Sequence, residues 1–309
     1  MKTALLFPGQ GAQKVGMGSA LAAEAPAARA VYEEADAVLG FSLSKLCFEG
    51  PESELVLTKH TQPAILATSI AVYRVLAERG LAFDVVAGHS LGEWSALVAA
   101  GALELADAIR LTHLRGTFMQ EAVPAGQGAM AAIMGLEPAP LRAMCAQASA
   151  PGEPVEPANF NGAGQIVISG HAAAVERAIA AARPAGAKRA VKLAVSAPFH
   201  CSMMKPAADR LAAALADITI RAPRVPVIAN VTAQPTQDPA QIRQLLIEQV
   251  SSPVRWEESV QAMAGLGVTR GFELGPGKVL AGLVKRIAEQ LETTSIGEPA
   301  EVAAFTPAT

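Results

Sequence analysis

The chain has 309 residues, which is enough for one large domain or for a large domain that carries a smaller one. Its 25 Lys and Arg residues against 28 Asp and Glu residues give a formal net charge of −3, so no excess of positive charge is available for a nucleic-acid backbone. Hydrophobic residues make up 51% and charged residues 17%, a composition typical of folded chains. We therefore expect a folded protein without a nucleic-acid partner.

The apolar content does not predict membrane spans. The apolar run 96–103 ends at an acidic residue, well short of the roughly 20 residues that a bilayer requires. The apolar stretch before Pro8 is too short for the core of a signal peptide. The cysteines Cys47, Cys145 and Cys201 show no CxxC spacing, which argues against a disulfide framework and against a zinc site. We expect a cytoplasmic protein with no membrane partner and no metal.

Short apolar runs that end in glycine or proline alternate with helical patterns along much of the chain. The strands predicted in this way are 3–7, 83–87 and 271–274, and the helices are 26–39, 64–79, 93–100, 105–119, 205–218 and 278–291. Pro63 stands at a plausible first helical position, and Gly80 closes the helix that follows it. This alternation predicts an α/β protein with a mostly parallel sheet. The tail after Ser295 has no periodicity, and we expect it to be loose.

Residues 123–196 have a different order of predicted strands and helices. The predicted order is strand 130–134, helix 141–148, strands 155–160 and 165–169, helix 172–182 and strand 189–195. This β-α-β-β-α-β order is the ferredoxin-like pattern, which can close on itself as a small domain. We therefore predict a large α/β domain from 1–122 and 197–309, and an inserted ferredoxin-like domain from 123–196.

Residues 88–92 read Gly-His-Ser-Leu-Gly and match G-x-S-x-G between a predicted strand and a predicted helix. In that context a sharp turn holds the serine hydroxyl exposed, and the glycines let neighbouring backbone approach closely. Ser90 is therefore a candidate nucleophile. The backbone N–H of Leu91, at the start of the following helix, is a candidate oxyanion donor. A tight turn with an incidental serine is the alternative.

A serine hydroxyl is a poor nucleophile until a base takes its proton. Three of the five histidines are most simply interpreted as packed or solvated helical residues, and His89 projects away from its neighbour Ser90. His200 lies in a proline-containing turn after the last strand of the inserted domain, a kind of loop that positions catalytic groups. It is the candidate base, and a structural role is equally compatible with the residues alone.

Arg115 lies on an apolar helix face. On the predicted helix 105–119 it shares that face with Ala108, Leu111 and Met119. A guanidinium in such a place needs an anionic partner. The residues leave two interpretations open, a structural ion pair with a nearby carboxylate or a bidentate clamp for a substrate carboxylate.

Four separated motifs together make the chain resemble the bacterial malonyl-CoA:acyl-carrier-protein transacylases. They are Phe-Pro-Gly-Gln-Gly-Ala-Gln at 7–13, Gly-His-Ser-Leu-Gly-Glu at 88–93, Ser-Ala-Pro-Phe-His at 196–200 and Glu-Leu-Gly-Pro-Gly-Lys at 273–278. The resemblance implies an α/β-hydrolase-like large domain with a ferredoxin-like small domain. It implies transfer of a malonyl group from malonyl-CoA to the phosphopantetheine thiol of acyl carrier protein, in fatty-acid biosynthesis. No cofactor is expected, because a thioester is already activated.

The resemblance also assigns the catalytic pair. It makes Ser90 the nucleophile and His200 the general base. In this family a backbone carbonyl, rather than an acidic side chain, orients the imidazole, and Gln249 matches that position. The surrounding segment 249–256 departs somewhat from the usual family sequence.

The substrate-binding groups follow from the same resemblance. Arg115 corresponds to the arginine that binds the malonyl carboxylate, and the backbone N–H groups of Gln10 and Leu91 correspond to the oxyanion donors. The implied partners are therefore malonyl-CoA and acyl carrier protein.

Three other functions compete with this interpretation. A free-standing acyltransferase that loads polyketide synthase carriers would use the same chemistry, although the form of 196–200 favours fatty-acid synthesis. A hydrolase would admit water instead of a carrier thiol, and a non-catalytic carrier-binding subunit would not need the full set of reactive residues. The basic cluster Lys188, Arg189 and Lys192 could face CoA phosphates or a carrier helix, or could form a solvated strand edge.

Overall fold

The larger sheet of the protein contains the first and the last described strands of the chain and is almost entirely parallel. The computed structural model describes residues 2–195 and 197–307. The sheet has six strands in the order β10 (Glu292–Ile296), β9 (Val268–Leu274), β1 (Lys2–Phe7), β2 (Val85–Gly88), β7 (Val227–Ile228) and β8 (Pro235–Thr236). Only the β7–β8 pair is antiparallel. The predicted α/β class with a mostly parallel sheet is confirmed.

The central strand β1 is buried on both faces, which explains its continuous apolar sequence. Side chains alternate between the two faces of a strand. Leu5 and Phe7 belong to a core formed with the helices on one side, and Ala4 and Leu6 belong to a second core on the other side. Because Phe7 is in register with Gly88 of β2, the loops that follow β1 and β2 leave the sheet side by side at its carboxyl edge.

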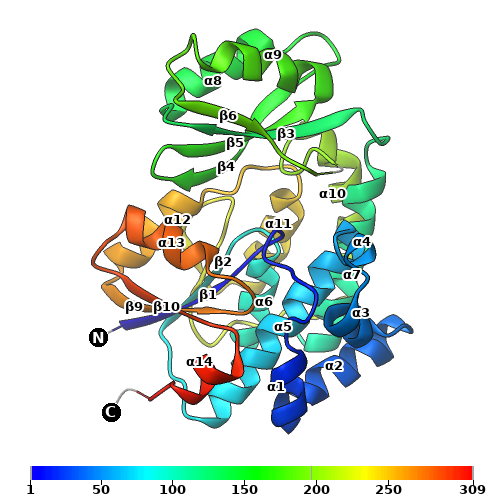
Figure 1. Ribbon diagram of the computed structural model, residues 1–309, viewed down its shortest axis with the longest axis vertical. Helices are drawn as coiled ribbons and strands as arrows, with labels where there is room; N and C mark the ends of the chain where they lie inside the picture. The colour runs from blue at the N-terminus through cyan, green and yellow to red at the C-terminus, as the bar shows by residue number, and fades with distance from the viewer. Residues whose placement is uncertain (1, 196, 308–309) are drawn as a thin grey trace.

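Helices cover both faces of this sheet (Figure 1). One core packs against the helices α2 (Pro26–Leu39), α5 (Thr58–Glu78), α6 (Gly92–Ala99), α7 (Leu105–Glu121) and α10 (Lys205–Leu215). The second core packs against α12 (Trp256–Gly265) and α13 (Val279–Ile287). The remaining helices of this part are α1 (Ser19–Glu24), α3 (Leu43–Glu49), α4 (Glu52–Leu55), α11 (Pro239–Gln249), α14 (Pro299–Ala303) and the short 3-10 turn Ser202–Met204.

One helix begins earlier than predicted. The helix α5 starts at Thr58, so Pro63 lies inside it rather than at its first position. A proline within a helix leaves the carbonyl four residues earlier without its N–H partner. That carbonyl belongs to Lys59, and the Nδ1 atom of His113 on α7 lies 2.8 Å from it. The neighbouring helix thus supplies the hydrogen bond that the proline cannot.

Residues 296–307 of the tail are ordered, contrary to the prediction. The last strand β10 continues to Ile296, and α14 follows it. Glu298 and Glu301 form a capping box at the start of α14, and the Arg79 guanidinium donates to the carbonyl of Val302. Capping and a long-range contact, rather than apolar periodicity, hold this segment in place.

The second sheet is antiparallel and has the predicted ferredoxin-like order. Its elements are β3 (Gly128–Met134), α8 (Pro138–Ala148), β4 (Val155–Gly162), β5 (Gln165–His171), α9 (Ala172–Ala182) and β6 (Arg189–Lys192). The strand order is β4-β5-β3-β6, with every neighbouring pair antiparallel. The predicted domain limits at 122/123 and 196/197 stay a prediction, and Ser196 itself lies outside the described residues.

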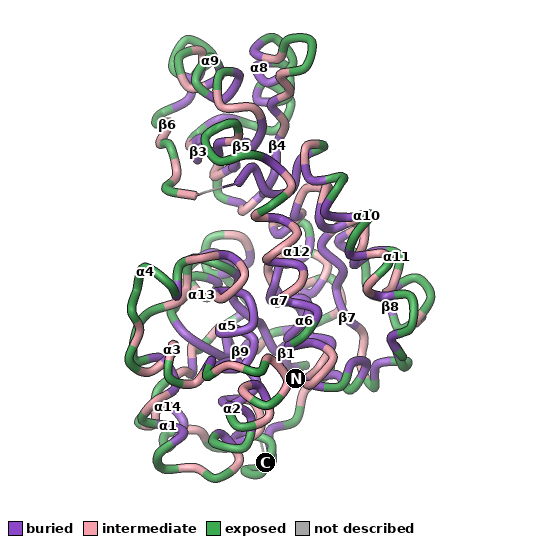
Figure 2. Tube along the Cα trace, turned by 90° about the vertical axis from the view of Figure 1, so that its right-hand side faces the viewer, coloured by how far each residue is buried: buried purple, intermediate pink, exposed green. Residues whose placement is uncertain are grey.

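The two faces of this small sheet have different partners. Ile133 and Ile168 pack under α8 and α9 in a core of their own. Met130, Ala132 and Val167 point to the other face and join the core of the large domain. Figure 1 shows α8 and α9 outermost and the strands between them and the large domain, and Figure 2 shows exposed residues on the outward side of both helices. The inner face of the small sheet therefore lies opposite the carboxyl edge of the large one.

Among the described helices, none combines the length and the apolar character that a membrane crossing requires.

Candidate active site

The turn between β2 and α6 holds Ser90 in a left-handed backbone conformation, with φ of 51°. The two flanking glycines are sterically required. A Cβ atom on Gly88 would lie 1.9 Å from the carbonyl carbon of Gly92, and a Cβ atom on Gly92 would lie 1.9 Å from the carbonyl oxygen of Phe7. The predicted strand, sharp turn and helix are therefore present, and the tight packing of this turn against the end of β1 raises Ser90 into the cleft.

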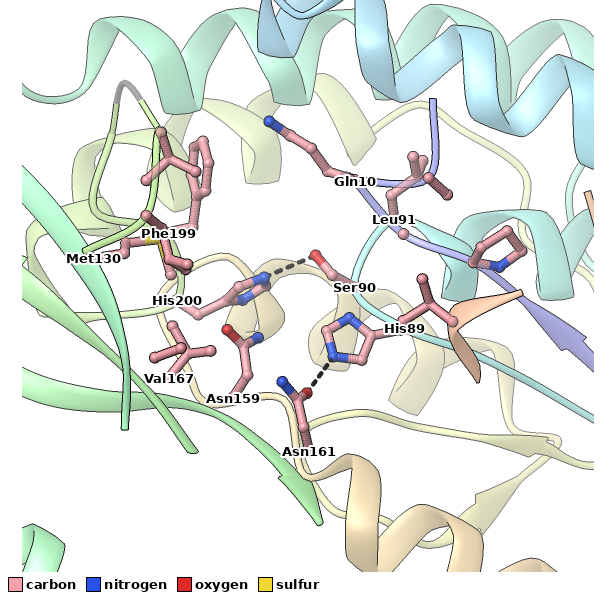
Figure 3. Close-up of a pocket in the computed structure, with 18 of the residues that line it drawn as sticks. Gln10, His89, Ser90, Leu91, Met130, Asn159, Asn161, Val167, Phe199 and His200 are labelled. Carbon is pink, nitrogen blue, oxygen red and sulfur yellow. Dashed lines mark hydrogen bonds between the residues drawn. The ribbon is translucent and has the colours of Figure 1, made fainter. Parts of the chain in front are cut away.

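Ser90 and His200 meet, although 110 residues separate them in the chain. The Ser90 Oγ atom lies 2.7 Å from His200 Nε2, as the dashed line in Figure 3 shows. On the opposite side of the ring, His200 Nδ1 lies 2.8 Å from the backbone carbonyl oxygen of Gln249. A carbonyl only accepts, so Nδ1 carries the proton and Nε2 is free to accept the serine proton.

The environment keeps this imidazole neutral. His200 is 4% exposed. Burial, together with the nearby Arg115 cation, lowers the pKa of His200 to about 3, while the hydrogen bond to Gln249 acts in the opposite direction. At neutral pH the ring is therefore unprotonated, as a general base must be.

Arg115 reaches the same serine from the inner face of α7. Its Nη2 atom donates to Ser90 Oγ at 3.1 Å and to Gln249 Oε1 at 3.1 Å, and its Nη1 atom donates to Gln62 Oε1 at 2.6 Å. The side chain is 1% exposed, and burial lowers its pKa to about 10. Within the described part of the chain it forms no ion pair, so the structural ion pair considered from the sequence is absent. The guanidinium is held by neutral oxygens and faces the serine.

The two predicted oxyanion donors lie at the ends of β1 and β2. Gln10 belongs to the loop after β1, and Leu91 immediately precedes α6. A hydrogen bond of 3.0 Å from the His89 N–H to the Phe7 carbonyl joins these two loops. Within residues 2–195 and 197–307, the N–H groups of Gln10 and Leu91 donate to no other group. Figure 3 shows both residues beside Ser90, so two free N–H groups are available there.

A cavity of about 300 Å³ surrounds these groups. Its large-domain side contains the residues just described. Its opposite side is formed by the inner face of the small sheet and by the segment that follows β6. The sheet residues there are Met130, Ala132, Asn159, Asn161, Gln165 and Val167, and the segment contributes Leu193 and Val195. Figure 3 shows Met130 and Val167 across the cavity from Leu91. The cavity therefore lies between the two domains.

Two sets of contacts join the domains at the edge of this cavity. The His89 Nε2 atom lies 2.9 Å from Asn161 Oδ1 on β4 (Figure 3). The backbone of β4 also pairs with the segment after α11: the Phe160 N–H donates to the Val254 carbonyl, and the Val254 N–H donates to the Ala158 carbonyl, both at 2.8 Å. Burial lowers the pKa of His89, which points away from Ser90 Oγ and serves as a link between domains.

Sequence reasoning missed a buried polar network beneath Ser90. The Asn230 side chain accepts from the Ser90 N–H at 2.7 Å and donates to the Gly88 carbonyl at 2.7 Å. Its own N–H donates to Glu93 Oε2 at 3.0 Å, and Gln249 Nε2 donates to the same oxygen at 2.7 Å. Two signals were available for Glu93, its place at the end of the 88–93 motif and its position as an acid in the first turn of an otherwise apolar helix, and Asn230 carried none.

Two other groups singled out in the sequence make structural contacts: Glu273 of the fourth motif and the basic cluster. Glu273, from the fourth motif, accepts from the N–H groups of Leu280 and Ala281 at the start of α13, which explains the motif as a cap of that helix. In the basic cluster, Lys192 Nζ lies 2.5 Å from Glu176 Oε1. Lys192 belongs to β6, which is an edge strand of the small sheet. Among the described residues, no group of three or more His, Cys, Asp or Glu side chains could hold a metal ion.

Comparison with known proteins agrees with this geometry. The family model of the acyl transferase domain matches residues 4–307. The malonyl CoA-acyl carrier protein transacylase of Escherichia coli (strain K12) is 52% identical over 302 residues, which cover 97% of each chain. A solved acyl carrier protein S-malonyltransferase from Vibrio cholerae superposes with a TM-score of 0.95 at 50% identity, covering 98% of this chain and 99% of that one. A solved malonyl-transacylase in complex with its type II PKS acyl-carrier protein has a TM-score of 0.95 at 47% identity, covering 98% of both chains. The chain therefore belongs to the acyl transferase domain family and, within it, to the malonyl CoA-acyl carrier protein transacylases.

Proposed function

We propose that the protein transfers a malonyl group from malonyl-CoA to the phosphopantetheine thiol of acyl carrier protein, through a malonyl ester of Ser90. One observation carries the proposal: a single hydroxyl lies 2.7 Å from a neutral imidazole nitrogen and 3.1 Å from a buried guanidinium. The first group activates a nucleophile, and the second selects an acyl group that ends in a carboxylate.

In the first half-reaction, Ser90 Oγ attacks the thioester carbon while His200 Nε2 takes the hydroxyl proton. The N–H groups of Gln10 and Leu91 stabilise the charge that develops on the carbonyl oxygen. The carbon–sulfur bond then breaks, the imidazolium returns the proton to the departing sulfur, and CoA leaves as a free thiol. The malonyl group remains on Ser90 as an ester.

In the second half-reaction the carrier thiol replaces CoA in the cavity. Its proton passes to His200 Nε2 as its sulfur attacks the ester carbon, and the imidazolium returns a proton to the Ser90 oxygen when that bond breaks. Because both thiols use the same position, the two substrates act in turn. Each step exchanges a thioester for an ester or the reverse, so we expect no metal or redox cofactor.

Arg115 determines the class of acyl group in this proposal. Malonyl carries a carboxylate two carbons from its reacting carbonyl, and the guanidinium lies within hydrogen-bond distance of the attacking oxygen. An acetyl group lacks the carboxylate and leaves the buried cation without an anionic partner. We also propose a cytoplasmic location, which the buried free thiols of Cys47, Cys145 and Cys201 support.

The test uses labelled malonyl-CoA with and without a holo carrier protein, followed by peptide mapping. We expect label on the peptide that contains Ser90, loss of that label on addition of carrier, and no label in Ser90→Ala. Ser95→Ala is a matched control, because Ser95 is a buried serine of α6, the helix that follows Ser90, and it should label like the original protein. Label that persists in Ser90→Ala would refute the proposal, and release of free malonate without carrier would indicate a hydrolase.

A second function, loading of polyketide synthase carriers, is favoured by the similarity to the malonyl-transacylase solved with its type II PKS carrier. The chemistry at Ser90 is the same in both. Offering one fatty-acid carrier and one polyketide carrier to the malonylated protein separates them. We expect faster transfer to the fatty-acid carrier. Faster transfer to the polyketide carrier would make polyketide carrier loading the preferred function.

A further inference from the structure

Arg115 is a buried cation whose three hydrogen-bond acceptors are all uncharged. A buried charge is costly unless it is paired and hydrogen-bonded. The nearest compensation comes through one intermediate side chain. Gln249 accepts from Arg115 through Oε1 and donates through Nε2 to the carboxylate of Glu93, which is 3% exposed. The amide of Gln249 thus connects the buried cation to a buried acid.

The orientation of this amide matters because its two ends are chemically different. As placed, Oε1 faces the Arg115 donor, and Nε2 faces three acceptors, Glu93 Oε2 at 2.7 Å, the Ser90 carbonyl at 3.0 Å and Asn230 Oδ1 at 3.4 Å. A rotation by 180° would set NH₂ against the guanidinium and oxygen against the carboxylate, so that every one of these bonds would be lost. Glu93 Oε2 serves as the acceptor for two donors, the Asn230 N–H and Gln249 Nε2, so Glu93 selects the orientation in which Arg115 keeps its acceptor.

Gln249 also serves the base. Its backbone carbonyl accepts from His200 Nδ1 at 2.8 Å, while its side chain contacts Arg115 and Glu93. On the other side, Glu93 Oε2 accepts from the N–H of Asn230, whose side chain holds the Ser90 N–H. One carboxylate oxygen therefore anchors both the residue that orients the imidazole and the residue that holds the serine turn.

We propose that Glu93 is a positioning residue that fixes the Gln249 amide and thereby keeps Arg115 directed at Ser90 Oγ, so that the preference for acyl groups ending in a carboxylate depends on it. The inference rests on the proposed function, since it concerns the selectivity of that reaction. Burial raises the pKa of Glu93 to about 7, and its two donors and the Arg115 charge favour the ionised form. Glu93 acts through Gln249 and does not touch the acyl group.

The test compares Glu93→Ala with Glu93→Gln. Among the described residues, Glu93 Oε1 makes no hydrogen bond, so a glutamine can place its oxygen where Oε2 lies and keep both bonds. Each variant is incubated with malonyl-CoA and, separately, with acetyl-CoA, and the rate of acyl-Ser90 formation is measured by intact mass spectrometry. The ratio of the malonyl rate to the acetyl rate is compared, because a smaller fraction of folded protein lowers both rates equally. Glu104→Ala, which removes an exposed acid, is the matched control.

We expect Glu93→Ala to lower the malonyl-to-acetyl ratio about tenfold, because one hydrogen bond to a charged group is lost. Glu93→Gln and Glu104→Ala should keep the ratio within about twofold. If Glu93→Ala does not fold, Gln249→Met tests the same step, because it keeps the backbone carbonyl and removes the amide, and it should lower the ratio equally. A folded Glu93→Ala or Gln249→Met with an unchanged ratio would overturn the proposal, as would a Glu93→Gln that loses as much as Glu93→Ala.

Failure of the proposed function would look different. In that case the unsubstituted protein would form no acyl-Ser90 with either thioester. If only the Glu93 proposal fails, the unsubstituted protein still forms acyl-Ser90, and Glu93→Ala has the same malonyl-to-acetyl ratio as the unsubstituted protein.

Discussion

The two walls of the active-site cavity differ in kind. The large-domain wall presents a serine, a histidine and an arginine joined by hydrogen bonds, and a second histidine, His89, beside them. The small-domain wall, within the described residues, presents apolar and amide side chains without a titratable group. The comparison indicates that one wall holds the groups to which the proposed chemistry is assigned, while the other bounds the space with uncharged side chains.

The sequence of the small sheet explains this difference. Its strands pack under α8 and α9 on one face and against the large domain on the other, so both faces carry apolar residues, and the face toward the cavity adds only amide side chains. The large domain instead concentrates its polar groups where the loops after β1 and β2 meet, at the carboxyl edge of a parallel sheet. Substitutions on the two walls should therefore have effects of different size.

The largest effect is expected from His200→Ala, which removes the base from the large-domain wall. Loss of a positioned general base costs roughly 10²–10⁴ in rate. The rate of malonyl-Ser90 formation in single-turnover mass spectrometry measures it. His171→Ala, a partly exposed histidine at the end of β5, should leave that rate unchanged.

The pH dependence sharpens the same prediction. A histidine loses its capacity to accept a proton as the pH falls below its pKa, and burial with the Arg115 charge lowers that of His200 to about 3. The acylation rate is best measured against pH in Glu93→Gln. Burial raises the pKa of Glu93 to about 7, so in the unsubstituted protein this acid would titrate within the range from pH 5 to pH 7. We expect a constant acylation rate from pH 7 to pH 5. A fall of more than about tenfold would indicate a histidine near its ordinary pKa of about 6.5.

Arg115→Ala should have the next largest effect, on selectivity rather than on the acylation machinery. A charge-assisted pair with a carboxylate contributes about 1.5–3 kcal/mol, so malonyl-CoA should lose roughly ten- to a hundredfold relative to acetyl-CoA. Competition between the two thioesters, read as the mass of acyl-Ser90, measures the change. Arg110→Ala provides the control, since Arg110 is an exposed arginine of α7 that pairs with Asp107. Unchanged selectivity would remove Arg115 from its assigned role.

The smallest effect is expected from Val167→Ala on the small-domain wall. It deletes two methyl groups and should lower the free energy of unfolding by roughly 1–2 kcal/mol, as measured in urea. The malonyl-Ser90 formation rate should change by less than about threefold. A loss comparable to that of His200→Ala would contradict the distinction between the two walls.

Much of the site could be predicted because its motifs combine a local conformation with a reactive side chain. Ser90 needs only the strand, turn and helix of one short segment, and the glycines of that segment are visible in the sequence. The structure brings Ser90, His200, Arg115 and the Gln249 carbonyl together as the resemblance implied. Their catalytic roles stay predictions until the variants are measured.

The polar network could not be predicted, because its members interact only after the chain has folded. Glu93 and Gln249 are 156 residues apart, and nothing local distinguishes this glutamine from a surface one. One interpretation of the residues alone pairs Arg115 directly with a carboxylate, whereas the structure inserts the Gln249 amide between Arg115 and Glu93. Hydrogen-bond direction, which depends on three-dimensional placement, decides that outcome.

The errors in the fold have a similar origin. Apolar periodicity located α2 and α9 at their observed limits but gave no signal for α14, which depends on a capping box. It also placed Pro63 at a helix start, whereas His113 from a neighbouring helix compensates the proline inside α5. Periodicity reports burial along one element, and it does not report contacts supplied by another.

The paired backbone of β4 and Val254 has a mechanical consequence. Val254 lies five residues after Gln249, whose carbonyl holds the imidazole. A displacement of the small sheet that kept both backbone hydrogen bonds would move segment 250–254 with it. That movement would change the hydrogen bond between the Gln249 carbonyl and His200 Nδ1. The width of the entrance for a thiol carrier and the alignment of the proton acceptor are therefore not independent variables in this molecule.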